Sequence, residues 1–198
     1  SGDGSTLVFK TLTTDEEPKY KTTDFPKTRH VTKLMSHMDG YGWYPNDGVY
    51  TLNTVDVATG KVTKVFESAY SFKLVDVDQT GALAAYTRQT NPELDTDYDP
   101  TSGLYFYDLT EKTETWVTES VAGGSFNDAS FSPDGQTVAV VGNDQSHQGM
   151  TVDDLWVYDV QSEKLTNLTH ADDTVVVGFG GEMASDFVQH SKEKGVYG

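Results

Sequence analysis

The sequence contains no cysteine. This absence excludes disulfide bonds, a thiolate metal site and a cysteine nucleophile, and it is typical of proteins that work in a reducing compartment. We therefore expect a cytoplasmic location. Residues 1–5 also lack the basic stretch and following apolar run of a signal peptide.

Basic residues are scarce. Fourteen Lys and Arg stand against 31 Asp and Glu, which gives a formal net charge of -17. A surface of this charge repels phosphate backbones and anionic lipid, so we expect neither nucleic acid nor a membrane as a partner. No apolar run approaches the roughly 18 residues that a membrane-spanning helix needs.

The sequence also lacks long runs of Ala, Leu, Glu and Lys, the residues that favour helices. Eleven Tyr and nine Phe, together with many Val and Thr, favour strands instead. Apolar residues make up 36% of the chain and charged residues 23%, as in globular proteins with a modest core. We expect a single all-β domain over residues 1–198.

An internal repeat organises the chain. Residues 52–57, 104–109 and 155–160 align without gaps, with Asp56, Asp108 and Asp159 in register. Each segment is followed by a small or polar turn and a second short strand, which predicts a hairpin. The second strands of these hairpins are expected at residues 61–66, 113–117 and 164–168.

A glycine turn followed by an apolar strand is expected before each hairpin, and in the second and third units a further strand is expected ahead of that turn. The turns are Asp3-Gly4, Gly81 and the Ser-Pro-Asp-Gly sequence at 132–135, and the strands are residues 7–9, 72–77, 83–86, 126–131 and 138–141. Four antiparallel strands repeated about every 50 residues are typical of a propeller blade, which buries its faces only against neighbouring blades. The first unit carries an insertion within residues 15–48.

The predicted fold is therefore an all-β partial β-propeller, with about three four-stranded antiparallel blades and the start of a fourth. We expect the blades at residues 3–67, 70–119 and 124–170, with the next one beginning at 174–198. Three blades leave two apolar faces uncovered, so the isolated chain is expected to self-associate.

Several of these segments resemble one enzyme family. They are the turn at 132–135, the strand at 155–159, the closing segment at 165–169, and an insertion in which residues 30–34 (His-Val-Thr-Lys-Leu) precede residues 39–42 (Asp-Gly-Tyr-Gly). Together they resemble the acylaminoacyl-peptidase and dipeptidyl-peptidase branch of the prolyl oligopeptidase family. The resemblance implies the N-terminal propeller of a serine peptidase, which admits short peptides to an α/β-hydrolase domain with a Ser-His-Asp triad.

The catalytic part of such a hydrolase is missing from these 198 residues. No Gly-x-Ser-x-Gly motif occurs, and the nearest string, at residues 123–127, is expected to be a loop between blades. We expect no catalytic residue and no activity in this chain alone, whereas the parent protein would be a hydrolase that acts on peptides. The alternative is a free-standing TolB-like propeller that binds a protein and performs no chemistry.

Aromatic residues gather in the insertion. Tyr41, Trp43 and Tyr44, with Tyr50 just beyond them, are candidates to face a peptide substrate. The competing interpretation is that they pack the long connection onto its blade, and this is favoured because an aromatic anchor needs no ligand.

Metal and cofactor sites are not expected. Residues 91–99 place three Asp at alternate positions, as a calcium loop begins, but Pro100 and Phe106 stand where the loop needs Gly and Glu. A solvated acidic loop is favoured there, with weak cation binding as the alternative. The five His residues lack the spacing of a zinc site. They are His30, His37, His147, His170 and His190.

Overall fold

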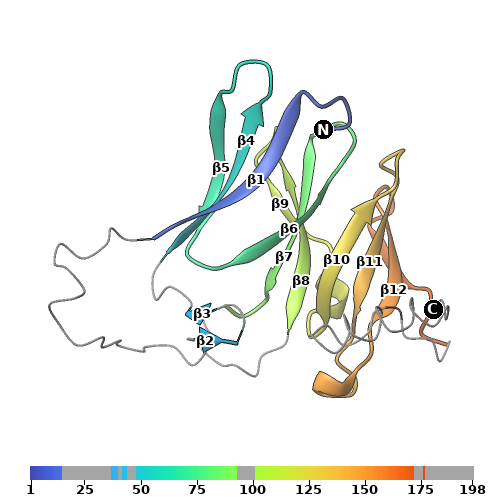
Figure 1. Ribbon diagram of the computed structural model, residues 1–198. Coiled ribbons are helices and arrows are strands. Elements are labelled where there is room, and N and C mark those ends of the chain that lie inside the picture. Colours follow the sequence, from blue (N-terminus) through green and yellow to red (C-terminus); the bar gives the residue numbers. More distant parts are fainter. Residues whose placement is uncertain (15–36, 40–41, 44–47, 93–100, 172–175, 177–198) are drawn as a thin grey trace, which may run out of the picture.

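The computed structural model describes residues 1–14, 37–39, 42–43, 48–92, 101–171 and 176. Its regular structure consists of β-strands and two short 3₁₀ turns. Figure 1 shows three groups of strands that lie side by side and follow one another in chain order. We call these groups the first, second and third units. Within the described residues, no helix has the length and apolar character needed to cross a bilayer.

The first unit is a three-stranded antiparallel sheet in the order β1-β4-β5. Its strands are β1 (Thr6–Thr13), β4 (Val49–Asp56) and β5 (Val62–Ser68). Thr13 pairs with Val49, so the chain leaves and re-enters the ladder at one point. This confirms the predicted insertion. Within the insertion, β2 (His37–Met38) and β3 (Gly42–Trp43) pair with each other.

Three of the four strands expected in the first unit lie among the described residues. The glycine turn before β1 forms as predicted, with Gly4 at φ +70°, close to the +75° of Gly81 and the +69° of Gly135. The Gly2 amide donates to the Gln79 carbonyl of the second unit at 2.8 Å. The glycine turns of the first and second units therefore contact each other.

The second and third units each contain four antiparallel strands in chain order. The second unit consists of β6 (Phe72–Val77), β7 (Leu83–Gln89), β8 (Ser102–Asp108) and β9 (Glu114–Trp116). The third consists of β10 (Ser125–Phe131), β11 (Thr137–Asn143), β12 (Asp154–Asp159) and β13 (Lys164–Asn167). One parallel pair, Ser102 with Ser125, joins them into a continuous sheet. The strands predicted in these two units are confirmed, whereas the predicted start of a fourth blade lies outside the described residues except for Val176.

The three aligned Asp residues have a common structural role, because each carboxylate accepts hydrogen bonds from the backbone of the hairpin turn that follows it. Asp56 accepts from the Thr59 amide at 2.7 Å, Asp108 from the Glu111 amide at 2.8 Å, and Asp159 from the Ser162 amide at 2.7 Å. Hydrogen bonds from the hydroxyl and amide of Thr59 lower the pKa of Asp56, and those of Ser162 lower the pKa of Asp159. The sequence repeat thus corresponds to a repeated hairpin turn whose backbone amide donates a hydrogen bond to the Asp carboxylate before it.

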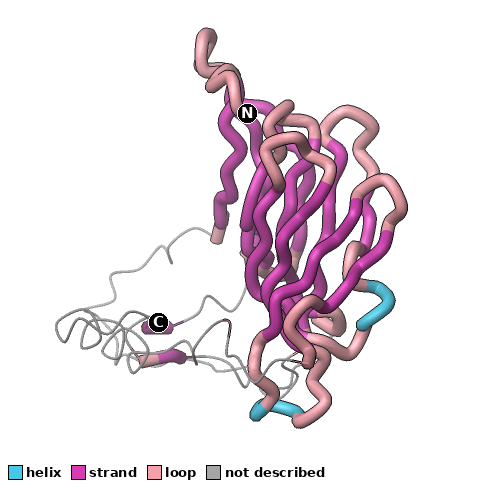
Figure 2. Tube along the Cα trace, turned by 90° about the vertical axis from the view of Figure 1, so that its right-hand side faces the viewer, coloured by secondary structure: helices cyan, strands magenta, loops and turns pink. Residues whose placement is uncertain are grey.

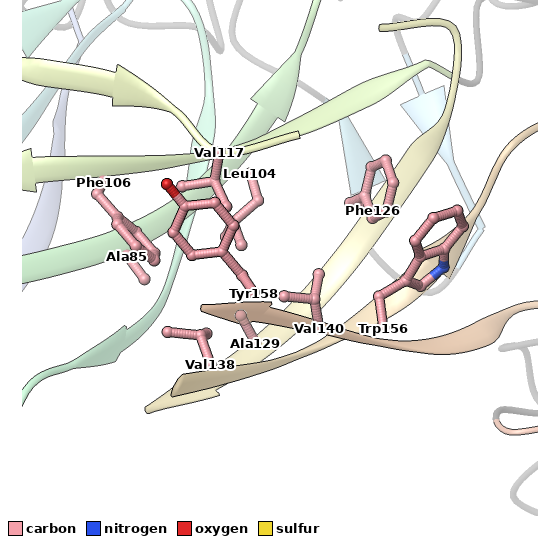
Figure 3. Close-up of a cluster of buried hydrophobic side chains, with 10 residues drawn as sticks. All are labelled: Ala85, Leu104, Phe106, Val117, Phe126, Ala129, Val138, Val140, Trp156 and Tyr158. Atoms are coloured by element: carbon pink, nitrogen blue, oxygen red, sulfur yellow. The ribbon is translucent and has the colours of Figure 1, made fainter. Parts of the chain in front are cut away.

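Apolar side chains from neighbouring units form two buried clusters. One lies between the first and second units and contains Leu52, Phe72, Ala84, Tyr86 and Tyr105. The other, drawn in Figure 3, lies between the second and third units and contains Ala85, Leu104, Phe106, Val117, Phe126, Ala129, Val138, Val140, Trp156 and Tyr158. Ala84 and Ala85 are consecutive on β7 and fully buried, yet they belong to different clusters. Because successive strand residues point to opposite faces, the second unit is covered on both sides.

The two ends of the strands differ. The Asp turns and the glycine turns lie at one end of the units. The Thr13–Val49 pair, where the insertion leaves the first unit, and the two 3₁₀ turns, η1 (Glu119–Val121) and η2 (Gln148–Met150), lie at the other end. Figure 2 shows both 3₁₀ turns in cyan toward the lower end, opposite the N-terminus. We call this the loop end.

Candidate functional site

A cavity of about 410 Å³ opens at the loop end, where the three units meet. It lies where β6 begins and β7 finishes, beside the first residues of β8 and β10 and part of β1. The described residues that line it are Lys10, Ser71, Phe72, Lys73, Thr87, Arg88, Gln89, Ser102, Phe126 and Asn127. Since all three units contribute to its wall, the cavity exists only when the units are packed together.

The lining of the cavity is basic. Lys10, Lys73 and Arg88 are cationic, and none of the ten described lining residues is acidic. The chain as a whole has more than twice as many acidic as basic residues. The charged side chains in the described lining are therefore all cationic, although the molecule as a whole is strongly negative.

Lys10 extends from β1 to the second unit. Its ammonium donates to the Phe72 carbonyl at 2.7 Å and lies 5.2 Å from the Tyr50 ring centroid and 5.5 Å from that of Phe72. Aromatic rings attract a cation through their negative faces, so the ammonium is held over them. Partial burial lowers the pKa of Lys10 because it disfavours the charged form.

Arg88 is held by an anion and an aromatic ring. Its guanidinium lies 4.3 Å from the Tyr105 ring centroid and donates to Glu114 at 2.8 Å. Glu114 also accepts a hydrogen bond from the Tyr86 hydroxyl. Burial raises the pKa of the Glu114 carboxyl. Arg88 is thus fixed in place and partly neutralised.

Lys73 lies on β6 and reaches the third unit. Its ammonium donates to the Asn127 carbonyl at 3.0 Å and lies 3.5 Å from the Asp128 carboxylate. The side chains of Lys73 and Asp128 are both 60% exposed, so this ion pair is weak.

The aromatic candidates of the insertion are only partly described. Tyr41 and Tyr44 lie outside the described residues, and only the backbone of Trp43 is placed, in β3 opposite His37. Their proposed contact with substrate stays a prediction. Tyr50 lies in β4 and packs against the cluster between the first and second units, so for this residue the packing interpretation is confirmed.

Other motifs of the sequence have structural positions. Gly124 lies in the connection between β9 and β10, and Ser125 is buried at the start of β10, with its hydroxyl 3.3 Å from that of Ser102. Of residues 123–127, which were expected to form a loop between blades, only Gly123 and Gly124 lie in the connection, and the other three begin β10. Most of the acidic loop, residues 93–100, lies outside the described residues. Within the described part of the chain, no three His, Asp or Glu side chains gather as a metal site would require.

Sequence reasoning missed the basic cavity. Lys10, Lys73 and Arg88 are far apart along the chain, and each looks like an ordinary exposed strand residue. The three residues share a position near the loop end of their strands. This shared position predicts a cavity only when it is known that the units lie side by side.

Comparison with known proteins identifies the architecture. The scan against protein-family models and the search of curated proteins find no match. Among solved structures, Pyrococcus horikoshii acylaminoacyl peptidase superposes on 86% of this chain with a TM-score of 0.62 and 15% identity. An acylaminoacyl peptidase in complex with Z-Gly-Gly-Phe-chloromethyl ketone superposes on 89% with a TM-score of 0.60 and 17% identity.

This chain folds as a partial β-propeller. The three units are its blades, and the cavity lies at the loop end of the partial propeller, where the blades meet. The chain spans 24% and 25% of the lengths of those two peptidase chains. TolB from Acinetobacter baumannii also matches, over 61% of this chain, with 17% identity and a TM-score of 0.43.

Proposed function

We propose that this chain is the propeller portion of a prolyl-oligopeptidase-family serine peptidase, of the acylaminoacyl or dipeptidyl type, and that it controls the access of short peptides to a hydrolase domain. The observation that supports this most is the coincidence of two independent findings. The chain superposes on acylaminoacyl peptidase over 86% of its length, and its first blade is interrupted at the point where the sequence resembles that family.

The chain itself serves as a filter in this proposal and performs no chemistry. Acyl transfer from a peptide bond needs a nucleophile, a base that activates it and an oxyanion hole. The sequence has no Gly-x-Ser-x-Gly elbow to supply the first. The peptide substrate and the hydrolase domain are therefore the partners we propose, and the lack of cysteine favours a cytoplasmic setting.

The complete reading frame tests the proposal. We expect it to encode a Gly-x-Ser-x-Gly motif. The complete protein should hydrolyse acetyl-alanine p-nitroanilide, whereas the 198-residue chain should not hydrolyse this substrate. We also expect the complete protein to cleave an acetylated hexapeptide and to leave casein intact, because the propeller limits substrate size.

Two results would contradict the proposal. A reading frame with four to eight blades and no hydrolase motif would favour the TolB-like alternative, a propeller that binds a protein. A complete protein that cleaves casein as fast as the hexapeptide would leave it a peptidase but remove the filtering role.

A further inference from the structure

The cavity at the loop end has cationic groups that the proposed function has not used. Its volume, about 410 Å³, falls in the range of roughly 300–1,000 Å³ that is usual for small-ligand sites. Its described lining combines three cations with the hydroxyl or amide groups of Ser71, Thr87 and Gln89, and contains no carboxylate. We propose that this cavity binds the free C-terminal carboxylate of a short peptide, with Lys10 and Lys73 as its principal partners. The identity of the ligand as a peptide rests on the proposed function.

Within the described residues, Lys10 has N–H donors without an oxygen acceptor. An ammonium carries three N–H groups, and the described residues provide one oxygen acceptor for it, the Phe72 carbonyl. The rings of Tyr50 and Phe72 hold the group in position without occupying a donor in a conventional hydrogen bond. An incoming carboxylate would thus meet a cation that is already oriented and partly desolvated, so fewer degrees of freedom are lost on binding.

Lys73 is the more adaptable partner. Its contact with Asp128 is long, at 3.5 Å, and both side chains are well exposed, so a carboxylate in the cavity can compete with Asp128 for it. Arg88 contributes mainly through its field, because Glu114 already holds its guanidinium. Lys10 and Lys73 therefore provide most of the uncompensated charge.

The field of the whole chain selects the kind of anion. With a net charge of -17, the molecule repels a ligand in proportion to the ligand's own negative charge. A monocarboxylate is repelled least, whereas phosphate and polyanions are repelled more strongly. The net charge of the chain therefore favours the carboxylate end of a peptide over a phosphorylated ligand.

Binding of two matched peptides tests the inference on the 198-residue chain. Acetyl-trialanine with a free carboxylate and acetyl-trialanine amide are titrated at low salt by isothermal calorimetry, with ¹⁵N chemical shifts recorded in parallel. We expect the acid to bind about tenfold or more tightly than the amide, since a charge-assisted hydrogen bond is lost in the latter. Its shift changes should centre on residues 71–73, 87–89 and 126–127.

Variants assign the effect to the cavity. Lys10→Met keeps the packing on the aromatic rings and Lys73→Gln keeps a donor for Asn127, and each should weaken binding of the acid about tenfold while leaving the amide unchanged. Lys73→Arg, which preserves the charge, should bind the acid within about threefold of the original chain. Lys64→Gln is the matched control, since Lys64 is an exposed β5 residue paired with Glu67 and absent from the described cavity lining.

The inference is overturned if acid and amide bind equally, if Lys10→Met and Lys73→Gln have no effect, or if inorganic phosphate binds more tightly than the acid peptide. Its failure is separate from that of the proposed function. Equal binding of the two peptides beside full peptidase activity of the complete protein rejects the cavity alone. Selective binding of the acid in a protein with no peptidase activity rejects the proposed enzyme and retains the carboxylate site.

Discussion

The carboxylate of Asp76 on β6 accepts a hydrogen bond from the backbone amide of Phe131 on β10, with 2.8 Å between oxygen and nitrogen. The same oxygen accepts from the Ser130 hydroxyl at 3.2 Å, and the other accepts from the Val77 amide at 2.8 Å. Asp76 thus provides the hydrogen-bond acceptor for the Phe131 amide, which lies on the side of β10 that faces away from β11. One side chain joins the inner strands of two units that share a single backbone pair at their other end.

Removing this carboxylate should loosen the contact between the second and third units. We expect Asp76→Ala to lower the free energy of unfolding by about 1.5–3 kcal/mol, because hydrogen bonds to a charged acceptor are lost and the Phe131 amide is left without its partner. Asp76→Asn, which keeps an acceptor oxygen, should cost less. Urea unfolding measures both, and equal losses in the two variants would show that the hydrogen bonds are not the cause.

The hairpin turns differ in backbone strain. Gly60, Lys112 and Glu163 occupy matching positions with φ of 69°, 58° and 54°, a conformation that glycine adopts without steric cost. We expect Lys112→Gly and Glu163→Gly each to raise the free energy of unfolding by about 0.5–1 kcal/mol, and Gly60→Lys to lower it by a similar amount. Thermal unfolding of the three variants checks this, and destabilisation by both glycine substitutions would contradict it.

Gly142 permits close packing in the third unit. A Cβ there would lie 2.4 Å from the Ser125 carbonyl oxygen and 2.7 Å from the Phe126 Cα, and backbone atoms cannot move aside cheaply. Gly142→Ala should therefore cost about 1–3 kcal/mol in unfolding free energy. Gly123→Ala is the matched control, since a Cβ at Gly123 meets nothing within 4 Å and should change stability by less than about 0.5 kcal/mol. Similar costs for both glycines would refute the steric explanation.

Glu114 should make stability depend on pH in the weakly acidic range. Burial raises its pKa above the ordinary value of 4.5, so the folded chain binds a proton at a pH where the unfolded chain has lost it. Its contribution is fully present below about 4.5 and is lost as the pH rises through the folded pKa. The free energy of unfolding of the original chain minus that of Glu114→Gln should therefore increase as the pH falls from 7 to 4.5. Urea unfolding of both proteins across this range provides the measurement, and a constant difference would contradict the prediction.

The first unit presents an uncovered apolar row. Leu7, Val55 and Val62 pair across β1, β4 and β5 on the face opposite the buried cluster, and Leu7 and Val62 are each 56% exposed. We expect the chain to self-associate through this face, because contact between copies removes apolar surface from water. Light scattering should give a mass above 21.8 kDa.

Substitution of the row should reverse this association. The double variant Leu7→Ser and Val62→Ser is expected to be monomeric, whereas Val152→Ser, which changes an exposed valine in the η2 loop of the third unit, should behave as the original chain. A monomeric mass for the original chain at working concentration would reject the prediction.

Much of the fold was predictable because its signals are local. The near-continuous apolar runs of β7 and β11, the glycine turns before them and the carboxylates of Asp56, Asp108 and Asp159 all act over a few residues. The contact between the turns of the first two units was not predictable in the same way. Asp3-Gly4 forms the turn that its sequence predicts, but the hydrogen bond from the Gly2 amide to the Gln79 carbonyl joins segments far apart in the chain.

The strands, their hairpin turns and the place of the insertion could be predicted from local sequence, since they depend on apolar patterns and turn chemistry between near neighbours. The packing of the units places Ala84 against one neighbouring unit and Ala85 against the other, and it brings Lys10, Lys73 and Arg88 to one cavity. The Lys10 ammonium meets a carbonyl 62 positions away in the chain. Contacts of that range form when the faces of neighbouring units are buried together, so no short stretch of sequence encodes them.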